Sequence, residues 1–204
     1  MFSFNTDDFL ASYQTEFPTP ALGDGAKAGL AQLLGFLAED PNVTDVRWAA
    51  YMLATVKHEC ADTWRPIEEY GKGQGRPYGT PVIVTAPDGT QYSNVYYGRG
   101  FVQLTWKQNY DKMGQALGLG SALALHPEQA LEPAMAYNIM SHGMRAGSFT
   151  GLGLGRYIHD DVCDYLNARR IINALDQAER IAGYAQNFES LLRASLEQST
   201  VAGG

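Results

Sequence analysis

A segment that is apolar on every side dominates the first third of the chain. Nearly all side chains in residues 48–56 are apolar, with Thr55 as the mild exception. A helix with no polar face is buried on all sides, so this segment predicts the central helix of the fold. Because Lys57, His58 and Glu59 follow at once, the same helix brings a carboxyl group to the edge of the core.

Glu59 lies where ionisation is disfavoured. The C-terminal end of a helix is the negative end of its dipole, and burial also disfavours an anion. Both effects favour a protonated carboxyl group near neutral pH, which suits a general acid. We therefore predict that Glu59 donates a proton in a reaction.

Two further acids, Glu68 and Glu69, follow about ten residues later. On one continuous helix, ten residues rise about 15 Å, which is too far for one small shared site. Pro66 opposes such a helix, because proline disrupts a helix interior and favours an extended residue before it. The chain can therefore turn back and bring a second carboxylate towards the first, as glycoside hydrolysis requires. The same two acids could instead be solvated loop charges.

Composition and charge narrow the class of protein. We expect one domain, residues 1–204, since 45% hydrophobic and 18% charged residues are ordinary globular values. The net charge of -7 argues against nucleic-acid binding and against attachment to anionic lipid. No apolar run reaches the length of a transmembrane helix, and no basic head with an apolar core marks a signal peptide. We expect a monomer without an integral membrane segment.

Helical periodicity recurs on both sides of the central helix. It predicts helices over residues 6–17, 25–39, 105–117, 133–145, 160–175 and 177–196, with a shorter one near 127–131. Between them, a β-branched run at 82–85, a turn at 86–89 and a second run at 90–97 predict a hairpin. The expectation is a mostly helical chain with one small β wing.

Residues 96–105, YYGRGFVQLT, predict a second wall of a binding site. If this segment is extended, period two places Phe101, Gln103 and Thr105 on one face, away from the core. Gln103 and Thr105 could then hold a water molecule between an amide and a hydroxyl group. Two alternatives stay open: Thr105 could cap the following helix as part of a capping box, and Tyr97 could fill the core instead of stacking on a sugar.

Four segments in this order resemble family 19 glycoside hydrolases: HEC at 58–60, PIEEYG at 66–71, YYGRGFVQLT at 96–105 with Asn109-Tyr110, and ARRIIN at 168–173. The similarity runs from about residue 46 to 188. The chain is most similar to the short phage and prophage endolysins of that group, which are relatives of plant-type chitinases. The resemblance implies a mostly α (α+β), lysozyme-like fold with two lobes and a small β-hairpin wing.

The resemblance also implies roles for individual residues. Glu59 matches the general acid and Glu69 the general base, with Glu68 as its rival, while Gln103 and Thr105 match positions that bind substrate and orient the water. The predicted catalytic residues are thus Glu59, Glu69 and Thr105, and the predicted substrate-binding residues are His58, Glu68, Tyr97, Arg99, Gln103, Asn109 and Asn173. The sequence departs from the chitinases after Asn173, with Ala174 and Leu175 where glycines are usual.

The reaction that the resemblance implies is hydrolysis of β-1,4 glycosidic bonds with inversion. The two carboxyl groups are then about 6.5 to 9.5 Å apart, against about 5 to 5.5 Å in a retaining enzyme. No metal ion or cofactor is needed. We expect peptidoglycan strands as the substrate, with chitin as the alternative. The expected location is the cytoplasm of a bacterial host, with action at the cell wall after release.

Other interpretations use residues near Glu59. His58 with Cys60 or Asp62 could suggest a metal site, but HExxH is absent and zinc needs three or four ligands. Cys60 could be a catalytic thiol or a small packed side chain, and we expect both it and Cys163 to be reduced. A non-catalytic glycan-binding or virion module is the remaining alternative.

Overall fold

The computed structural model describes residues 1–197, and the chain divides into two compact units. Within the described part, unit 1 comprises residues 1–64, 157–169 and 175–197, and unit 2 comprises residues 65–156 and 170–174. Each unit therefore combines segments that are distant in sequence. Unit 1 carries Glu59, and unit 2 carries Glu69.

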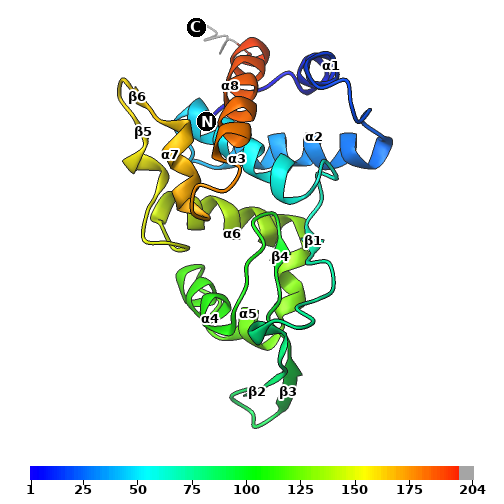
Figure 1. Cartoon of the computed structure of the whole chain (residues 1–204), viewed down its shortest axis with the longest axis vertical. Coiled ribbons are helices and arrows are strands. Elements are labelled where there is room, and N and C mark those ends of the chain that lie inside the picture. Colours follow the sequence, from blue (N-terminus) through cyan, green and yellow to red (C-terminus); the bar gives the residue numbers. More distant parts are fainter. Residues whose placement is uncertain (198–204) are drawn as a thin grey trace, which may run out of the picture. The chain divides into compact units, whose positions relative to one another are not determined.

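Unit 1 is built on a pair of helices, α3 (Val46–Glu59) and α8 (Ala178–Ser195), which pack against each other (Figure 1). Helix α8 also contacts α1 (Thr6–Glu16) and α7 (Tyr165–Ala168), and α1 contacts α2 (Asp24–Glu39). A short hairpin, β5 (Ile158–His159) with β6 (Val162–Cys163), completes this unit. The chain then passes into unit 2 through the 3-10 turn η4 (Arg169–Ile171).

Helix α3 confirms the prediction of a central helix. It begins at Val46, where the Asp45 carboxylate caps it by accepting a hydrogen bond from the Arg47 backbone N–H at 2.9 Å. Every residue from Ala49 to Lys57 is buried. The one polar residue among the apolar ones, Thr55, donates its hydroxyl proton to the Tyr51 carbonyl at 2.9 Å. The core of unit 1 therefore fixes the helix that ends in Glu59.

A buried ammonium group anchors the turn after Glu59. Lys57 is 5% exposed; it pairs with Asp62 and donates to the Tyr13 hydroxyl at 2.9 Å. Its Nζ also lies 4.3 Å from the ring centroid of Phe17, within reach of a cation–π interaction. Asp62 has a φ of 63°, which is unusual for a residue other than glycine. The ion pair and the rings thus hold a backbone turn that is unfavourable by itself.

Unit 2 contains two strand pairs and several helices and 3-10 turns (Figure 1). Its strands form two antiparallel pairs, β1 (Ile67–Glu68) with β4 (Arg99–Gly100) and β2 (Val82–Thr85) with β3 (Gln91–Asn94). Its helices and 3-10 turns are η1 (Pro77–Gly79), α4 (Lys107–Ala116), α5 (Ala122–Leu125), η2 (Pro127–Leu131), α6 (Pro133–Ala146) and η3 (Leu154–Arg156).

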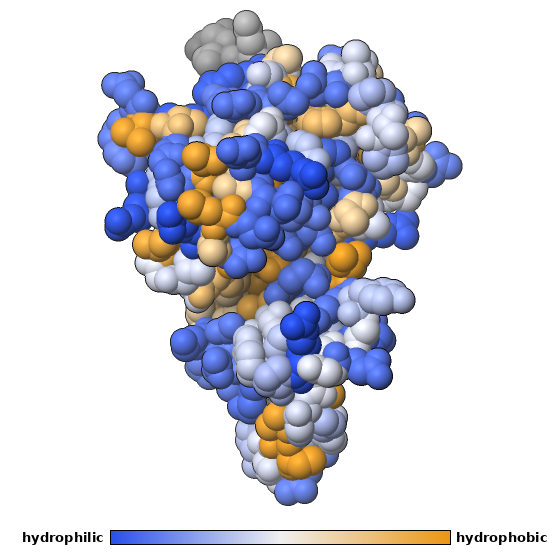
Figure 2. Space-filling model, in the orientation of Figure 1, coloured by the Kyte–Doolittle hydropathy of each residue, from blue (hydrophilic) through white to orange (hydrophobic). Residues whose placement is uncertain are grey.

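The β2–β3 pair confirms the predicted hairpin. Its turn residues 86–89 close with a hydrogen bond from the Gly89 N–H to the Ala86 carbonyl at 2.9 Å. Val82 and Ile83 on β2 are exposed, and an apolar patch lies over the hairpin in Figure 2. Within residues 1–197, none of the helices is long and apolar enough to cross a membrane.

Two sequence predictions about local structure were wrong. Residues 160–175 do not form one helix, because β6, α7 and η4 interrupt the segment. Residues 101–105 are not extended, because Gly100 at φ 86° reverses the chain and the Leu104 N–H donates back to the Arg99 carbonyl at 2.9 Å. As a result, Phe101 is 2% exposed and lies in the core, not on a binding face.

Candidate active site

Glu59 ends α3 and is held by a buried arginine. The Arg169 Nη1 donates to the Glu59 Oε1 at 2.8 Å, and the two side chains are 3% and 18% exposed. The Arg169 Nε donates to the Asp176 carbonyl at 3.0 Å. Arg169 therefore fixes one oxygen of the predicted acid. It belongs to the segment at 168–173 that carries the resemblance, but the sequence analysis gave it no role.

The neighbours of Glu59 in the chain do not form a thiol or metal centre. Cys60 is fully buried, and burial, followed by the adjacent Glu59, raises the pKa of its thiol. A thiol with a raised pKa is a poor nucleophile, so Cys60 acts as a small packed side chain. His58 is half-buried, and its backbone carbonyl accepts a hydrogen bond where α3 ends. No group of three metal-ligating residues occurs within residues 1–197.

Glu68 and Glu69 differ in their surroundings, although they are adjacent in the chain. Glu68 pairs with Lys72 at 2.8 Å and accepts a hydrogen bond from the Tyr97 hydroxyl at 2.5 Å. These two donors, Lys72 first, lower the pKa of Glu68. The Arg99 Cζ lies 3.6 Å from the centroid of the Tyr97 ring. Glu68 is thus tied into a set of cationic and aromatic neighbours.

Tyr97 and Arg99 lie inside unit 2. They are 7% and 6% exposed, and the Arg99 Nη1 donates to the Tyr110 hydroxyl at 3.1 Å and to the Val95 carbonyl at 3.0 Å. Tyr97 therefore packs in the core, which is one of the two alternatives that the sequence left open. Its hydroxyl group also supports Glu68. Their role in substrate binding stays a prediction.

Among the contacts within residues 1–197, the groups that donate hydrogen bonds to the Glu69 carboxylate are neutral. The Tyr78 hydroxyl donates to its Oε1 at 2.8 Å, and the Gly98 N–H donates to its Oε2 at 3.0 Å. The Glu69 N–H in turn donates to the Gly98 carbonyl at 2.7 Å. This reciprocal pair of bonds fixes the carboxylate against the backbone of Gly98, and the bond to Glu69 raises the pKa of Tyr78.

Gln103 and Thr105 meet at the same glycine. A Cβ atom on Gly98 would lie 2.7 Å from the Gln103 Oε1 and 3.3 Å from the Thr105 Oγ1. Gly98 therefore lies against three polar groups, the Glu69 carboxylate through its N–H and the Gln103 amide oxygen and Thr105 hydroxyl group through its Cα. The structure brings these three predicted residues together, although residues 101–105 are not the extended strand from which the sequence argued.

The hydrogen bonds of Gln103 and Thr105 use their donors and leave lone pairs on their oxygens. The Gln103 Nε2 donates to the Ile67 and Gly100 carbonyls at 3.1 and 3.2 Å, so its Oε1 stays available as an acceptor. The Thr105 hydroxyl donates its proton to the Gln103 carbonyl at 2.8 Å, so its oxygen is also an acceptor. Thr105 does not cap α4, whose N-cap is Trp106. A water molecule among these acceptors would donate both protons and keep its own lone pairs free.

The remaining predicted residues lie in unit 2 and bind backbone groups. The Asn109 Nδ2 donates to the Thr105 carbonyl at 2.8 Å and so supports the site. Asn173 is exposed, and its Oδ1 accepts a hydrogen bond from the Ala174 N–H at 2.8 Å. Their contact with substrate stays a prediction.

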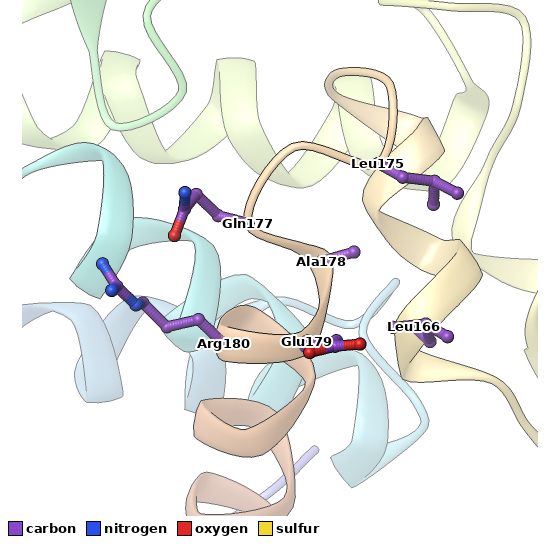
Figure 3. A pocket seen from close by; sticks show the side chains of 6 residues that line it. All are labelled: Leu166, Leu175, Gln177, Ala178, Glu179 and Arg180. Atoms are coloured by element: carbon purple, nitrogen blue, oxygen red, sulfur yellow. The ribbon is translucent and has the colours of Figure 1, made fainter.

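Unit 1 also contains an open pocket of about 580 Å³ where α7 and the start of α8 come together (Figure 3). Its walls are Leu166, Leu175, Gln177, Ala178, Glu179 and Arg180. In Figure 3, Gln177 and Arg180 extend to one side of the start of α8, and the two leucines lie on the other. Asp176, which precedes this helix start, accepts the hydrogen bond from Arg169. Arg169 thus links the loop beside this pocket to Glu59.

The fold matches solved chitinase structures. Chitinase C from Streptomyces griseus HUT6037 aligns over 91% of this chain and 93% of its own, with a TM-score of 0.52 and 22% identity. A bacterial family 19 chitinase aligns over 89% of this chain and 93% of its own, with a TM-score of 0.55 and 23% identity. The predicted mostly α, lysozyme-like fold is thereby confirmed as that of the family 19 chitinases.

Sequence similarity to curated proteins is confined to short stretches. Over 48 residues, 23% of the chain, it is 40% identical to the acidic 26 kDa endochitinase of Solanum lycopersicum. Over 46 residues it is 41% identical to the acidic endochitinase pcht28 of Solanum chilense. The matched stretches span 19% and 18% of those relatives, about a fifth of their length. No protein-family model matches the chain.

Proposed function

We propose that the chain is a glycoside hydrolase that cleaves β-1,4 linkages between N-acetylated amino sugars with inversion. The observation that carries this proposal is the set of acceptors around Gly98. Glu69, Gln103 and Thr105 meet at this glycine. A water molecule bound by them would donate one hydrogen bond to the carboxylate and the other to the amide or hydroxyl oxygen. Such a water is oriented for attack on an anomeric carbon, with Glu69 as the general base.

Glu59 is the proton donor in this proposal. Its Oε1 accepts the bond from Arg169, so the proton that the leaving oxygen receives would be on Oε2. As Glu59 protonates the glycosidic oxygen, the C–O bond breaks. The water attacks the anomeric carbon from the opposite face, and Glu69 takes up its proton. Protons balance over the cycle when the two carboxyl groups exchange one with solvent.

The choice of Glu69 over Glu68 as the base rests on their partners. Glu68 is bound to a lysine and a tyrosine, and its pKa is lowered. Glu69 has neutral donors and lies next to the acceptors that would hold the water, so it suits the role of base.

The stereochemistry of the product tests the proposal. With N-acetylglucosamine hexamer as substrate, ¹H NMR during the first minutes should show the α-anomer at the new reducing end, because inversion converts a β linkage into an α product. Glu59→Gln should abolish the signal. A β-anomer formed first would overturn inversion, and equal turnover by Glu59→Gln would overturn the assignment of the acid. If neither oligomers nor purified sacculi are cut, the chain is a non-catalytic glycan-binding module.

Two glycans fit this reaction. Peptidoglycan, in the role of an endolysin that acts at a bacterial wall, is supported by the resemblance of four segments to phage and prophage enzymes. Chitin is supported at least as well, since the curated relatives are endochitinases. Mass analysis of fragments released from purified sacculi separates the two, with chitin oligomers assayed alongside. Reducing N-acetylmuramic acid ends indicate a muramidase, reducing N-acetylglucosamine ends a glucosaminidase, and release only from chitin oligomers a chitinase.

A further inference from the structure

Trp106 has a backbone conformation that a bulky residue rarely adopts. Its φ and ψ are 72° and 133°, a region of the map that is populated almost only by glycine. Backbone hydrogen bonds hold it there: its N–H donates to the Tyr96 carbonyl at 2.9 Å, and its carbonyl accepts from the Asn109 N–H at 2.9 Å. Glycine is also a good N-cap residue, so the start of α4 does not require an indole at this position.

The side chain at this strained position is exposed. Trp106 is 41% exposed, whereas Trp64 is 1% exposed and the indole N–H of Trp48 donates to the Ile158 carbonyl at 2.9 Å. These are the three tryptophans of the chain. Both the strained backbone and the exposure of a large apolar side chain to solvent are unfavourable for folding. Such a combination points to a role outside folding.

Trp106 is coupled to the predicted base through one side chain. The ring of Tyr78 meets the indole edge-to-face, with the ring centroids 5.2 Å apart and an interplanar angle of 77°. The hydroxyl of the same tyrosine donates to the Glu69 Oε1 at 2.8 Å. Thr105, the residue before Trp106, lies beside Gly98. The exposed indole thus lies beside the group of residues to which the water is assigned.

We propose that Trp106 is a stacking platform for a pyranose ring of the bound glycan. This ring would lie next to the glycosidic bond for whose hydrolysis Glu69 is the general base. One face of a β-linked amino sugar carries axial C–H groups and is apolar, and a flat indole buries that face without needing polar partners. Tyr78 contacts the indole in a T-shaped arrangement, and the exposed part of the indole is available to the sugar. This inference rests on the proposed function and adds a binding residue to it.

Intrinsic fluorescence provides the direct test, because one tryptophan of three is expected to respond. In the Glu59→Gln background, N-acetylglucosamine hexamer should shift the emission to shorter wavelength as the indole is covered. The shift should persist in Glu59→Gln with Trp48→Phe, and disappear in Glu59→Gln with Trp106→Gly. Calorimetry on the last variant should show affinity reduced about tenfold or more, which is about 1.4 kcal/mol.

Trp106→Gly is the informative replacement, because glycine adopts this φ without strain. Its thermal midpoint should equal or exceed that of the parent, while KM in an otherwise active chain rises about tenfold and kcat changes less. Trp106→Phe should restore part of the affinity. A structural residue would behave in the opposite way, with a lower midpoint and an unchanged KM, and that result would overturn the inference.

The remaining outcomes separate the inference from the proposed function. If the native chain cuts oligomers and Glu59→Gln binds them without any change in Trp106 emission, the platform is excluded and the hydrolase stands. If neither oligomers nor sacculi are bound or cut, the proposed function fails and the platform fails with it. A shift that aliphatic tripeptides produce equally well, with none from sugars, would also overturn it.

Discussion

The two predicted catalytic acids are held in opposite ways. Glu59 ends a buried helix and is bound by the cation of Arg169, whereas Glu69 lies in an irregular segment and is bound by a tyrosine hydroxyl and a backbone N–H. Near Glu59 the charges are buried, with Lys57 paired to Asp62 as well. Near Glu69 the cation belongs to its neighbour, Glu68. The difference suggests that position is secured by charge at the first acid and by neutral hydrogen bonds at the second.

The largest expected effect separates the two adjacent acids of unit 2. Glu69→Gln should lower kcat by about 10²- to 10⁴-fold, the usual contribution of a general base. Glu68→Gln should change kcat by no more than a few-fold, because it removes only the bonds from Lys72 and Tyr97. Initial rates on oligomers and on sacculi measure both. The reverse order of effects would make Glu68 the base and Glu69 the supporting residue.

The second expected effect is on stability and concerns the buried charges of unit 1. Asp62→Asn should lower the free energy of unfolding by about 3 kcal/mol, because it leaves the Lys57 ammonium buried without its counter-ion. Asparagine tolerates a positive φ, so the backbone of the turn is preserved. Urea titration measures the change. The matched control is Asp111→Asn, which breaks the exposed pair with Lys107 and should cost at most about 1 kcal/mol.

The third effect tests whether Arg169 positions Glu59. Arg169→Gln should lower kcat about tenfold and leave KM nearly unchanged, because a charge-assisted bond of about 2 kcal/mol holds the acid and not the substrate. Arg169→Lys should recover part of the loss. Arg193→Gln removes an exposed partner of Glu189 and should leave both constants unchanged. An equal loss in both arginine variants would show that the effect is not specific to Glu59.

The smallest effect is a pH dependence at Glu68. Its pKa is lowered in the folded chain, mainly by Lys72, so the bonds to its carboxylate stabilise the fold above the pKa of an unfolded glutamate, about 4.3. That stabilisation is lost as the pH falls through the lower, folded value. The difference in thermal midpoint between the native chain and Glu68→Gln should therefore shrink from pH 6 to pH 3. A difference that stays constant would mean that the ion pair contributes nothing.

Local patterns in the sequence were enough for much of the fold. The run of apolar residues at 48–56 predicted α3. The β-branched run at 82–85 and the turn signal at 86–89 predicted the β2–β3 hairpin. These signals are local, because each depends on residues only a few positions apart.

The failures came from interactions that no local pattern contains. The segment 160–175 has helical spacing, but Asp164 caps only the short α7, and Arg169 beyond it is bound to Glu59 from another part of the chain. Likewise, Gln103 has a φ of 54°, which nothing in its side chain predicts. The turn at Gly100 and the pairing of Leu104 with Arg99 require it.

The candidate site was reached by resemblance more than by physics. Spacing identified Glu59 as an acid at a helix end, but the choice between Glu68 and Glu69 needed their actual partners. Tyr78 and Trp106 were missed, although an aromatic residue placed directly after Thr105 was a visible signal. Arg169 had no such signal, because it and Glu59 are 110 residues apart.

The lack of a side chain at Gly98 affects how this chain would respond to random mutation. It has no side chain to contribute, yet the Cβ atom of any replacement would lie 2.7 Å from the amide oxygen of Gln103 and displace the side chain that is assigned to hold the water. A systematic substitution scan for activity would then rank position 98 alongside the acids themselves. At that position, the property under selection is the absence of a side chain.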